Sequence, residues 1–196
     1  MIRSIAMKAV RAVRALIFCF VFCFAAGAIE PARAAGPAAN VDAARLDGAD
    51  QDPANWMTYG RTYSEQRFSP LDQITADNVN LLGLAWYADF DVDRGQEATP
   101  LIIDGVMYVS TAWSMVRAFD AKTGRPLWLY DPEVPRELGV RGCCDVVNRG
   151  VAAWKGKIFV GTFDGRLVAL DASTGQPVWS VMTVDPSVRS LNCCDA

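Results

Sequence analysis

Two pairs of adjacent cysteines have the most distinctive chemistry in this sequence. Cys143 and Cys144 lie in the run Gly-Cys-Cys-Asp-Val-Val-Asn-Arg-Gly at 142–150, and Cys193 and Cys194 lie near the last residue. A disulfide between neighbouring residues closes a small ring that distorts its own peptide bond, so it persists only where the surrounding structure holds it. A cross-link between the two pairs is the alternative, because exported proteins usually join cysteines that are distant in sequence.

Several other chemistries are excluded by composition. The chain contains no histidine, which removes Ser-His and Cys-His catalysis and covalent haem attachment through a Cys-x-x-Cys-His motif. Neither cysteine pair has the two-residue spacer that is usual for structural zinc. Asp47, Asp50 and Asp52 form an acidic cluster, for which a solvated arm and a calcium site are the two interpretations.

The first 34 residues have the pattern of an export signal. Basic residues precede an uncharged apolar stretch over 15–29, and Ala-Arg-Ala follows at 32–34. The stretch is shorter than the ~20 residues that a membrane-spanning helix needs, and the small residues suit a signal peptidase. We therefore expect a signal peptide over 1–34, a periplasmic product and no transmembrane segment after cleavage. An uncleaved anchor is the alternative.

Cleavage would make the protein more acidic. It removes five of the 19 basic residues and one of the 22 acidic residues, so the formal net charge changes from −3 to −7. Nucleic acids and anionic membrane surfaces favour basic patches. Neither is therefore expected as a partner.

An internal repeat organises the rest of the chain. Ala-Phe-Asp-Ala-Lys-Thr-Gly-Arg-Pro-Leu-Trp at 118–128 matches Ala-Leu-Asp-Ala-Ser-Thr-Gly-Gln-Pro-Val-Trp at 169–179, and Gly105 upstream matches Gly156. The offset is 51 residues. A period near 50 indicates a propeller, a solenoid or another repeat array.

Each repeat is predicted to form four short antiparallel strands. Asp-Gly or a similar turn between apolar runs is a strong hairpin signal. The predicted strands are 100–103, 106–110, 114–120, 126–130, 150–154, 157–162, 166–171 and 177–182. Residues 97–196 would thus hold two four-stranded units, preceded over 35–96 by an N-terminal arm and a first outer strand region.

The aspartate, the glycine and the tryptophan that the two repeats share each have a structural interpretation. The aspartates can accept backbone N–H groups of the turn, and the glycines can adopt the positive φ that a tight turn needs. A tryptophan at the same place in each unit is expected to pack against the neighbouring unit. These residues are Asp120, Gly124, Trp128, Asp171, Gly175 and Trp179.

Together these motifs resemble those of the quinoprotein dehydrogenases. The Ala-x-Asp-x-x-Thr-Gly-x-x-x-Trp motif is similar to that family's tryptophan-docking motif, and the Cys-Cys-Asp-Val-Val-Asn-Arg-Gly run strengthens the match. The segments at 55–61, 66–71 and 94–100 also resemble the family, so the likeness covers residues 55–185. It implies an all-β fold, here the first two to three blades of an eight-bladed propeller that carries pyrroloquinoline quinone (PQQ).

The resemblance also implies roles for four residues. Cys143 and Cys144 would form a vicinal disulfide over one face of the quinone. Arg149 would hold cofactor oxygens by charge-assisted hydrogen bonds, which suits the anionic rim of a flat tricarboxylate. Glu97 would contact the cofactor edge. Taken alone, Arg149 could be an exposed strand-start arginine and Glu97 a solvated carboxylate.

The implied activity is that of a soluble methanol or ethanol dehydrogenase. Such an enzyme oxidises a primary alcohol to an aldehyde by hydride transfer to PQQ, with a calcium or lanthanide ion as Lewis acid, an aspartate base and a cytochrome c-type electron acceptor. The metal ligands and the base are expected in later blades, beyond Ala196, so no catalytic residue is assigned here. The chain is expected to be an N-terminal fragment that is inactive alone.

A second class of function fits the same fold. Non-enzymatic propeller scaffolds of the outer-membrane assembly type use similar tryptophan repeats. Such a scaffold has no reason to keep a vicinal cysteine pair followed five residues later by an arginine. The enzyme is therefore the favoured interpretation.

Overall fold

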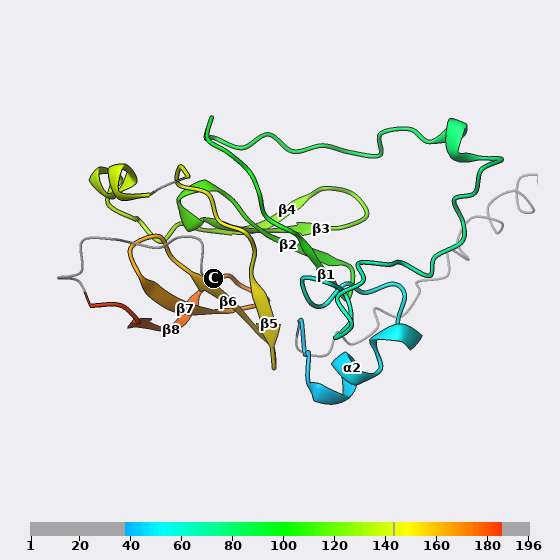
Figure 1. The fold of residues 1–196 in the computed structure, drawn as a ribbon, viewed down its shortest axis with the longest axis horizontal. Helices are drawn as coiled ribbons and strands as arrows, with labels where there is room; N and C mark the ends of the chain where they lie inside the picture. The colour runs from blue at the N-terminus through cyan, green and yellow to red at the C-terminus, as the bar shows by residue number, and fades with distance from the viewer. Residues whose placement is uncertain (1–37, 143, 186–196) are drawn as a thin grey trace, which may run out of the picture. The chain divides into compact units, whose positions relative to one another are not determined.

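The computed structural model describes residues 38–142 and 144–185 (Figure 1). The predicted signal peptide, Cys143, Cys193 and Cys194 lie outside the described residues. In this part of the chain the strands form two separate four-stranded antiparallel sheets. The all-β fold predicted from the 51-residue repeat is confirmed, with one sheet for each repeat.

The strands of each sheet follow one another in chain order. The first sheet has the order β1-β2-β3-β4 and the second has the order β5-β6-β7-β8. Their bounds are β1 (Leu101–Ile103), β2 (Val106–Ser110), β3 (Val116–Asp120), β4 (Pro126–Tyr130), β5 (Ala152–Trp154), β6 (Lys157–Gly161), β7 (Arg166–Asp171) and β8 (Pro177–Met182). Each sheet is thus a chain of hairpins.

Two-residue turns set the register at the start of each sheet. Asp104 and Gly105 adopt φ values of 52° and 82° between β1 and β2, so that Ile103 pairs with Val106. Positive φ at both turn residues is the geometry that matches the twist of a β-hairpin. The same arrangement recurs between β5 and β6.

Two strands begin two residues later than predicted. β3 begins at Val116 because residues 112–114 form the short 3-10 helix η3 (Ala112–Ser114), in which Trp113 and Ser114 have positive φ. β5 begins at Ala152, after Gly150 with φ 149°. Both departures involve the segment at 146–150, because the Trp113 N–H donates to the Val146 carbonyl and Gly150 lies just before β5.

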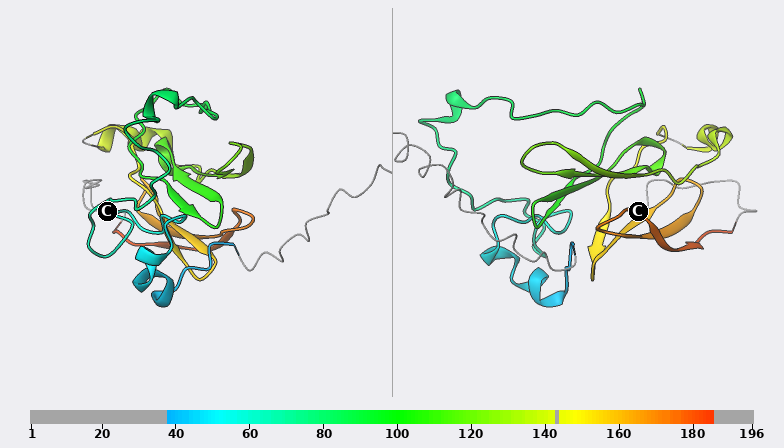
Figure 2. Two further views of the ribbon diagram at one scale, coloured as in Figure 1. Left: turned by 90° about the vertical axis from the view of Figure 1, so that its right-hand side faces the viewer. Right: turned by 180° about the vertical axis from the view of Figure 1, so that it is seen from behind.

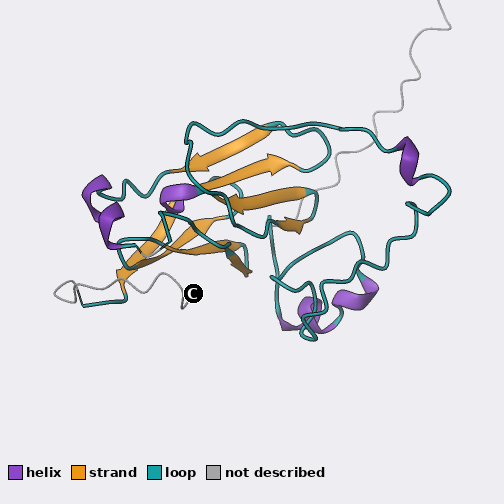
Figure 3. Cartoon of the chain, turned by 45° about the horizontal axis from the view of Figure 1, so that its top comes forward, coloured by secondary structure: helices purple, strands orange, loops and turns teal. Residues whose placement is uncertain are grey.

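Helices in the described residues are short. They are α2 (Ala43–Asp47), η1 (Ala49–Gln51), η2 (Val79–Leu81), η3 and η4 (Arg136–Arg141). Figure 3 shows the strands in two groups, with the chain before them mainly in loops. None of the helices in the described part of the chain is long and apolar enough to cross a membrane.

The N-terminal arm is hydrogen-bonded to the first hairpin of each sheet. Trp56 exchanges two backbone hydrogen bonds with Ile102 of β1, at 2.7 and 3.0 Å. Residues 39–41 accept hydrogen bonds from the β5–β6 turn, through the carbonyls of Ala39 and Val41. Because both of these residues are fully buried, the arm is part of the core.

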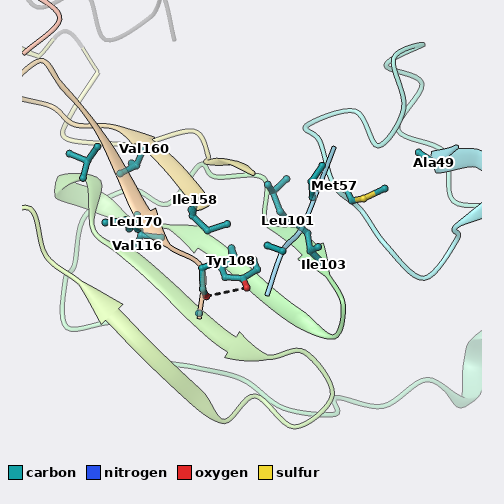
Figure 4. Close-up of a cluster of buried hydrophobic side chains, with 14 residues drawn as sticks. Ala49, Met57, Leu101, Ile103, Tyr108, Val116, Ile158, Val160 and Leu170 are labelled. Atoms are coloured by element: carbon teal, nitrogen blue, oxygen red, sulfur yellow. Dashed lines mark hydrogen bonds between the residues drawn. The ribbon is translucent and has the colours of Figure 1, made fainter. Parts of the chain in front are cut away.

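Side chains from both sheets and from the arm form the main core. Figure 2 shows the sheet of β1–β4 lying against the sheet of β5–β8. Tyr108 of β2 is fully buried, and its hydroxyl donates to the Ala172 carbonyl at 3.3 Å across the two sheets (Figure 4). The other buried members are Ala39, Val41, Ala49, Met57, Leu101, Ile103, Val116, Ala118, Ile158, Val160, Val168, Leu170 and Ala172.

The Asp-x-x-Thr-Gly turns have closely similar hydrogen bonds in the two sheets. The Asp120 carboxylate accepts from the backbone N–H groups of Lys122 and Thr123 at 3.2 and 2.8 Å, and from the Thr123 hydroxyl at 2.8 Å. Asp171 makes the equivalent three bonds at 2.9 to 3.0 Å. The glycines that end the motifs, Gly124 and Gly175, have φ near 71°.

Tryptophan docking joins the two sheets. Trp128 of β4 donates from Nε1 to the Ala172 carbonyl at 3.0 Å, and its ring lies against Gly175, where a Cβ atom would come within 2.6 Å. The glycine is therefore required both for its positive φ and for the close approach of the ring. Trp179 is 40% exposed and packs its ring against Phe159 of its own sheet.

A third tryptophan makes the same contact, and the sequence repeat did not reveal it. Trp86 donates from Nε1 to the Ala121 carbonyl at 3.1 Å, and its ring lies against Gly124. Trp86 therefore occupies, before the first sheet, the place that Trp128 occupies before the second. The repeat motif was not recognised there because the Asp-x-x-Thr-Gly turn that precedes the other tryptophans is missing.

Candidate functional site

Two chain segments that are far apart in sequence run side by side at the candidate site. Residues 94–99 precede β1, and residues 145–150 precede β5. A parallel bridge joins Thr99 to Gly150, and the Thr99 N–H donates to the Arg149 carbonyl at 3.2 Å. Gly150 has φ 149°, a backbone conformation that other residues rarely adopt, whereas a Cβ atom there would make only an ordinary contact with the Thr99 carbonyl, at 3.4 Å.

This pairing brings two of the predicted site residues together. Arg149 donates from Nε to Oε2 of Glu97 at 3.2 Å, and the two side chains are 49% and 46% exposed. Both charged side chains therefore reach the solvent. The structure thus places a guanidinium and a carboxylate on one exposed surface.

The described residues Gly142 and Cys144, on either side of Cys143, form the cysteine turn, which leads directly into the segment at 145–150. Cys144 is exposed and immediately precedes Asp145, while Cys143 lies outside the described residues. Gly142 lies on the other side of the pair, and a Cβ atom there would come within 2.7 Å of the Phe163 ring and 2.9 Å of the Asp145 carbonyl. Gly142 therefore packs closely against Phe163, which lies in the connection between β6 and β7, and a side chain at position 142 would clash.

A second ion pair lies beside the first, and it was not assigned from the sequence. Arg94 contacts Oδ1 of Asp145 from Nη2 at 2.6 Å and from Nε at 2.8 Å. The hydrogen bond from the Val146 N–H lowers the pKa of Asp145, burial opposes this effect, and Gly95 N–H and Arg94 add to it. Both residues lie in the motifs that carry the family resemblance, and this was the only signal that could have identified them.

The helix η3 is hydrogen-bonded to the segment at 145–150 and to the connection between β6 and β7. The Trp113 N–H donates to the Val146 carbonyl at 2.9 Å, and Ser114 Oγ accepts from the Phe163 N–H at 3.0 Å. Asn148 donates from Nδ2 to the Gly161 carbonyl of β6 at 2.9 Å. These bonds fix the backbone that presents Arg149.

Beneath the turn lies a small separate hydrophobic cluster. Its buried members are Ala112, Val134, Val146 and Phe163, with Trp113 packed against them. The guanidinium of Arg136 stacks 4.2 Å from the centre of the Trp113 ring, a cation–π contact that keeps the indole in a fixed orientation. The site thus has a packed floor and charged side chains at its surface.

The described residues contain no cluster of metal-ligand side chains. Across residues 38–142 and 144–185, no group of three or more Cys, Asp or Glu side chains could hold a metal ion. In the acidic cluster of the arm, Asp50 pairs with Arg61 at 3.4 Å, and Asp52 accepts from Asn55 at 2.8 Å. The calcium alternative for this cluster is therefore not supported.

Comparison with known proteins gives the same family as the motifs. The family described as glucose/ethanol/alcohol dehydrogenase, beta-propeller domain, designated PQQ, matches residues 56–184. The dehydrogenase subunit of alcohol dehydrogenase (quinone) from Komagataeibacter europaeus is 66% identical over 141 residues, which are 72% of this chain and 19% of that protein.

Two solved structures are also similar. Quinohemoprotein alcohol dehydrogenase ADHIIG from Pseudomonas putida HK5 is 57% identical with a TM-score of 0.75, over 76% of this chain and 22% of that one. A europium-containing methanol dehydrogenase is 38% identical with a TM-score of 0.68, over 72% of this chain and 25% of that one. The chain therefore spans about a fifth to a quarter of the length of these relatives. With a family match over two sheets and the tryptophan contacts that join them, this chain belongs to the PQQ family of glucose/ethanol/alcohol dehydrogenase β-propeller domains.

Proposed function

We propose that this chain contributes one wall of the PQQ site of an exported alcohol dehydrogenase. The observation that carries the proposal is the pairing of Glu97 with Arg149 at 3.2 Å, in the segment that the cysteine turn leads into. The relatives, which are named alcohol or methanol dehydrogenases, support the enzyme over a non-enzymatic scaffold.

The donor set fits the chemistry of the cofactor. PQQ is a flat tricarboxylate, and an exposed guanidinium provides several N–H donors in a planar array that matches carboxylates. In the proposed site Arg149 binds the anionic rim, while Glu97 orients the Arg149 guanidinium and contacts the cofactor edge. A disulfide between Cys143 and Cys144 excludes water from one face of the ring. When bound, PQQ supplies the hydride acceptor for oxidation of a primary alcohol to an aldehyde.

The remaining parts of the proposed enzyme have no counterpart among the described residues. We place the ligands of a calcium or lanthanide ion, and the aspartate base, in regions of the enzyme that correspond to the rest of its relatives. The europium-containing relative supports a metal ion in such enzymes. The name quinohemoprotein supports a haem-containing electron acceptor, which we propose to be of the cytochrome c type. This chain alone is then inactive.

Export to the periplasm is part of the same proposal. The basic and apolar pattern over 1–34 supports a cleaved signal peptide, and an oxidising compartment would allow the vicinal disulfide. Intact-mass analysis of the protein from the periplasmic fraction tests both points. A mature N-terminus near Ala35 and a disulfide within the 143/144 pair are expected. An uncleaved chain, or a bridge from 143 or 144 to 193 or 194, contradicts them.

Cofactor binding is tested by titrating PQQ into the purified full chain in an isothermal titration calorimeter. We expect saturable binding, and Arg149→Ala is expected to weaken it at least about tenfold through loss of charge-assisted hydrogen bonds. Arg45→Gln is the matched control, because it removes another arginine–carboxylate pair, with Asp104 at 2.9 Å, far from the site in sequence. Absence of binding, or equal affinity in Arg149→Ala, would count against the proposal.

A further inference from the structure

Two ion pairs connect the segments at 94–99 and 145–150, and the arginine comes from the first segment in one pair and from the second segment in the other. Arg94 pairs with Asp145 at 2.6 Å, and Glu97 pairs with Arg149 at 3.2 Å. One segment thus carries a positive and then a negative side chain, and its neighbour carries the reverse. If the segments slipped by one ion pair, Arg94 would face Arg149, and like charges opposite each other are unfavourable. The two pairs therefore favour a single register.

The residue next to Cys144 is held from several directions. Asp145 has φ 69°, which is costly for a residue other than glycine unless the surroundings hold it. Its carboxylate accepts from Arg94 Nε at 2.8 Å and from the Gly95 N–H at 3.4 Å. The next carbonyl, that of Val146, accepts from the Trp113 N–H at 2.9 Å. The arginine is the only charged partner among these donors.

The two segments approach closely at Gly95. A Cβ atom at this position would lie 3.0 Å from Cγ1 of Val147. The Arg94 guanidinium also lies over the Trp113 ring, 6.0 Å from its centre. Arg94 therefore connects the segment of Glu97 to both the cysteine turn and the η3 helix beneath it.

We propose that Arg94 and Asp145 are positioning residues that hold the turn bearing Cys144 in register with Glu97 and Arg149. The inference deepens the proposed function and rests on it for the identity of the cofactor. The side chains of the pair are 45% and 33% exposed, and exposed ion pairs contribute little to global stability. The consequence of losing the pair is therefore local: the turn shifts while the sheets remain folded.

Hydrogen exchange of the full chain without PQQ tests the hold on the turn. In Arg94→Gln and in Asp145→Asn, peptides covering 94–99 and 144–148 are expected to exchange at least about threefold faster, because local opening becomes easier. Peptides of β6 and β7 should not change, and Arg45→Gln should leave 144–148 unchanged. Unaltered exchange of 144–148 in both variants would overturn the inference, whether or not PQQ binds.

PQQ titration of the same proteins tests the positioning role. Each single variant is expected to bind PQQ at least about tenfold more weakly, and the double variant should be no worse than the weaker single one, because both remove the same pair. Arg94→Lys should bind with intermediate affinity, since one ammonium cannot reproduce both guanidinium contacts. Faster exchange with unchanged PQQ affinity would show that the pair is merely structural and would overturn the positioning role. If the wild-type chain does not bind PQQ, the proposed function fails, and the exchange result alone decides whether the pair holds the turn.

Discussion

Individual residues at the turns of this chain have requirements that are visible in their backbone geometry. Gly175 combines φ 72° with a ring placed so close that a Cβ atom would lie 2.6 Å from Trp128 Cε3. Gly105 has a similar φ of 82° but no atoms within 4 Å of a Cβ position, and Gly161 has neither constraint. Substituting each of the three glycines therefore tests a different case: strain with a clash at Gly175, strain alone at Gly105, and neither at Gly161.

Substitution of these glycines by alanine should give an ordered series. Gly175→Ala should lower the free energy of unfolding by about 2–4 kcal/mol, from strain plus overpacking. Gly105→Ala should cost about 1 kcal/mol from strain alone. Gly161→Ala should change stability by less than about 0.5 kcal/mol. Urea denaturation checks the order, and equal effects at 175 and 105 would show that the ring contact contributes nothing.

At the scale of the element, the β6–β7 hairpin is closed by an ion pair that is partly buried. Arg166 contacts Oδ2 of Asp164 at 2.7 Å, and the side chains are 27% and 13% exposed. Arg166 also donates to the Pro132 carbonyl at 2.7 Å, which ties the hairpin to the chain after β4. Partial burial raises the pKa of Asp164, but hydrogen bonds from Arg166 and Thr162 outweigh it, so the pKa lies below its usual value.

The lowered pKa of Asp164 predicts a pH dependence of stability. A carboxylate with a lowered pKa in the folded state stabilises the fold above its unfolded pKa, which is about 3.9, and this contribution disappears as the pH falls through the folded value. Asp164→Asn should therefore be less stable than the wild type at pH 7 by about 1–2 kcal/mol. The difference should shrink below about pH 4. Urea unfolding from pH 7 to pH 2.5 measures it, and a difference independent of pH would contradict the prediction.

At the scale of the whole molecule, a single carbonyl receives two hydrogen bonds between the sheets. Tyr108 and Trp128 of the first sheet both donate to the Ala172 oxygen of the second, at 3.3 and 3.0 Å. Burial of the phenol, with Asp104 and Asp171 nearby, raises the pKa of Tyr108, so that it stays a donor at any physiological pH. The sheets are therefore joined by polar contacts as well as by their hydrophobic core.

These two donors should show non-additive effects on stability. Tyr108→Phe and Trp128→Phe should each lower the free energy of unfolding, the tyrosine change by about 1 kcal/mol for one lost hydrogen bond. Each single variant leaves Ala172 with one donor, whereas the double variant leaves a carbonyl without either side-chain donor. The double variant should therefore lose more than the sum of the singles, and a double-mutant cycle checks this. Additive effects would mean that neither hydrogen bond to the Ala172 carbonyl compensates for loss of the other.

The last strand of the second sheet is exposed along its whole length. In the described structure β8 exposes large apolar side chains on both of its faces, and these are Val178, Trp179, Val181 and Met182. On the first sheet, the equivalent tryptophan is covered by the next repeat. Leu127 and Leu129 of β4 are themselves 37% and 51% exposed, so the exposure of Trp179, and not that of the whole strand, distinguishes the last described sheet from the first.

Much of the fold follows from short-range signals in the sequence. Asp-Gly turns and the Asp-x-x-Thr-Gly motif predict hairpins, because positive φ and side-chain caps act within two or three residues. The 51-residue repeat then sets the number of sheets. The later start of β3 was not predicted, because Trp113 and Ser114 make contacts with the distant residues Val146 and Phe163. The later start of β5 follows the bridge between Gly150 and the distant Thr99.

The site was predicted only in part, for the same physical reason. Glu97 and Arg149 were named from family resemblance, and the structure pairs them; the vicinal disulfide and the export signal remain predictions. Arg94, Asp145 and the docking role of Trp86 depend on contacts between residues that are 35 to 51 positions apart.

The sequence by itself determined the number and order of the strands, the turns, the repeat and the family, because each depends on local backbone preference or on a motif of adjacent residues. Only the tertiary structure decided which charges meet and which ring covers which glycine. Such pairings arise when the sheets bury their apolar faces against each other and bring distant segments into contact.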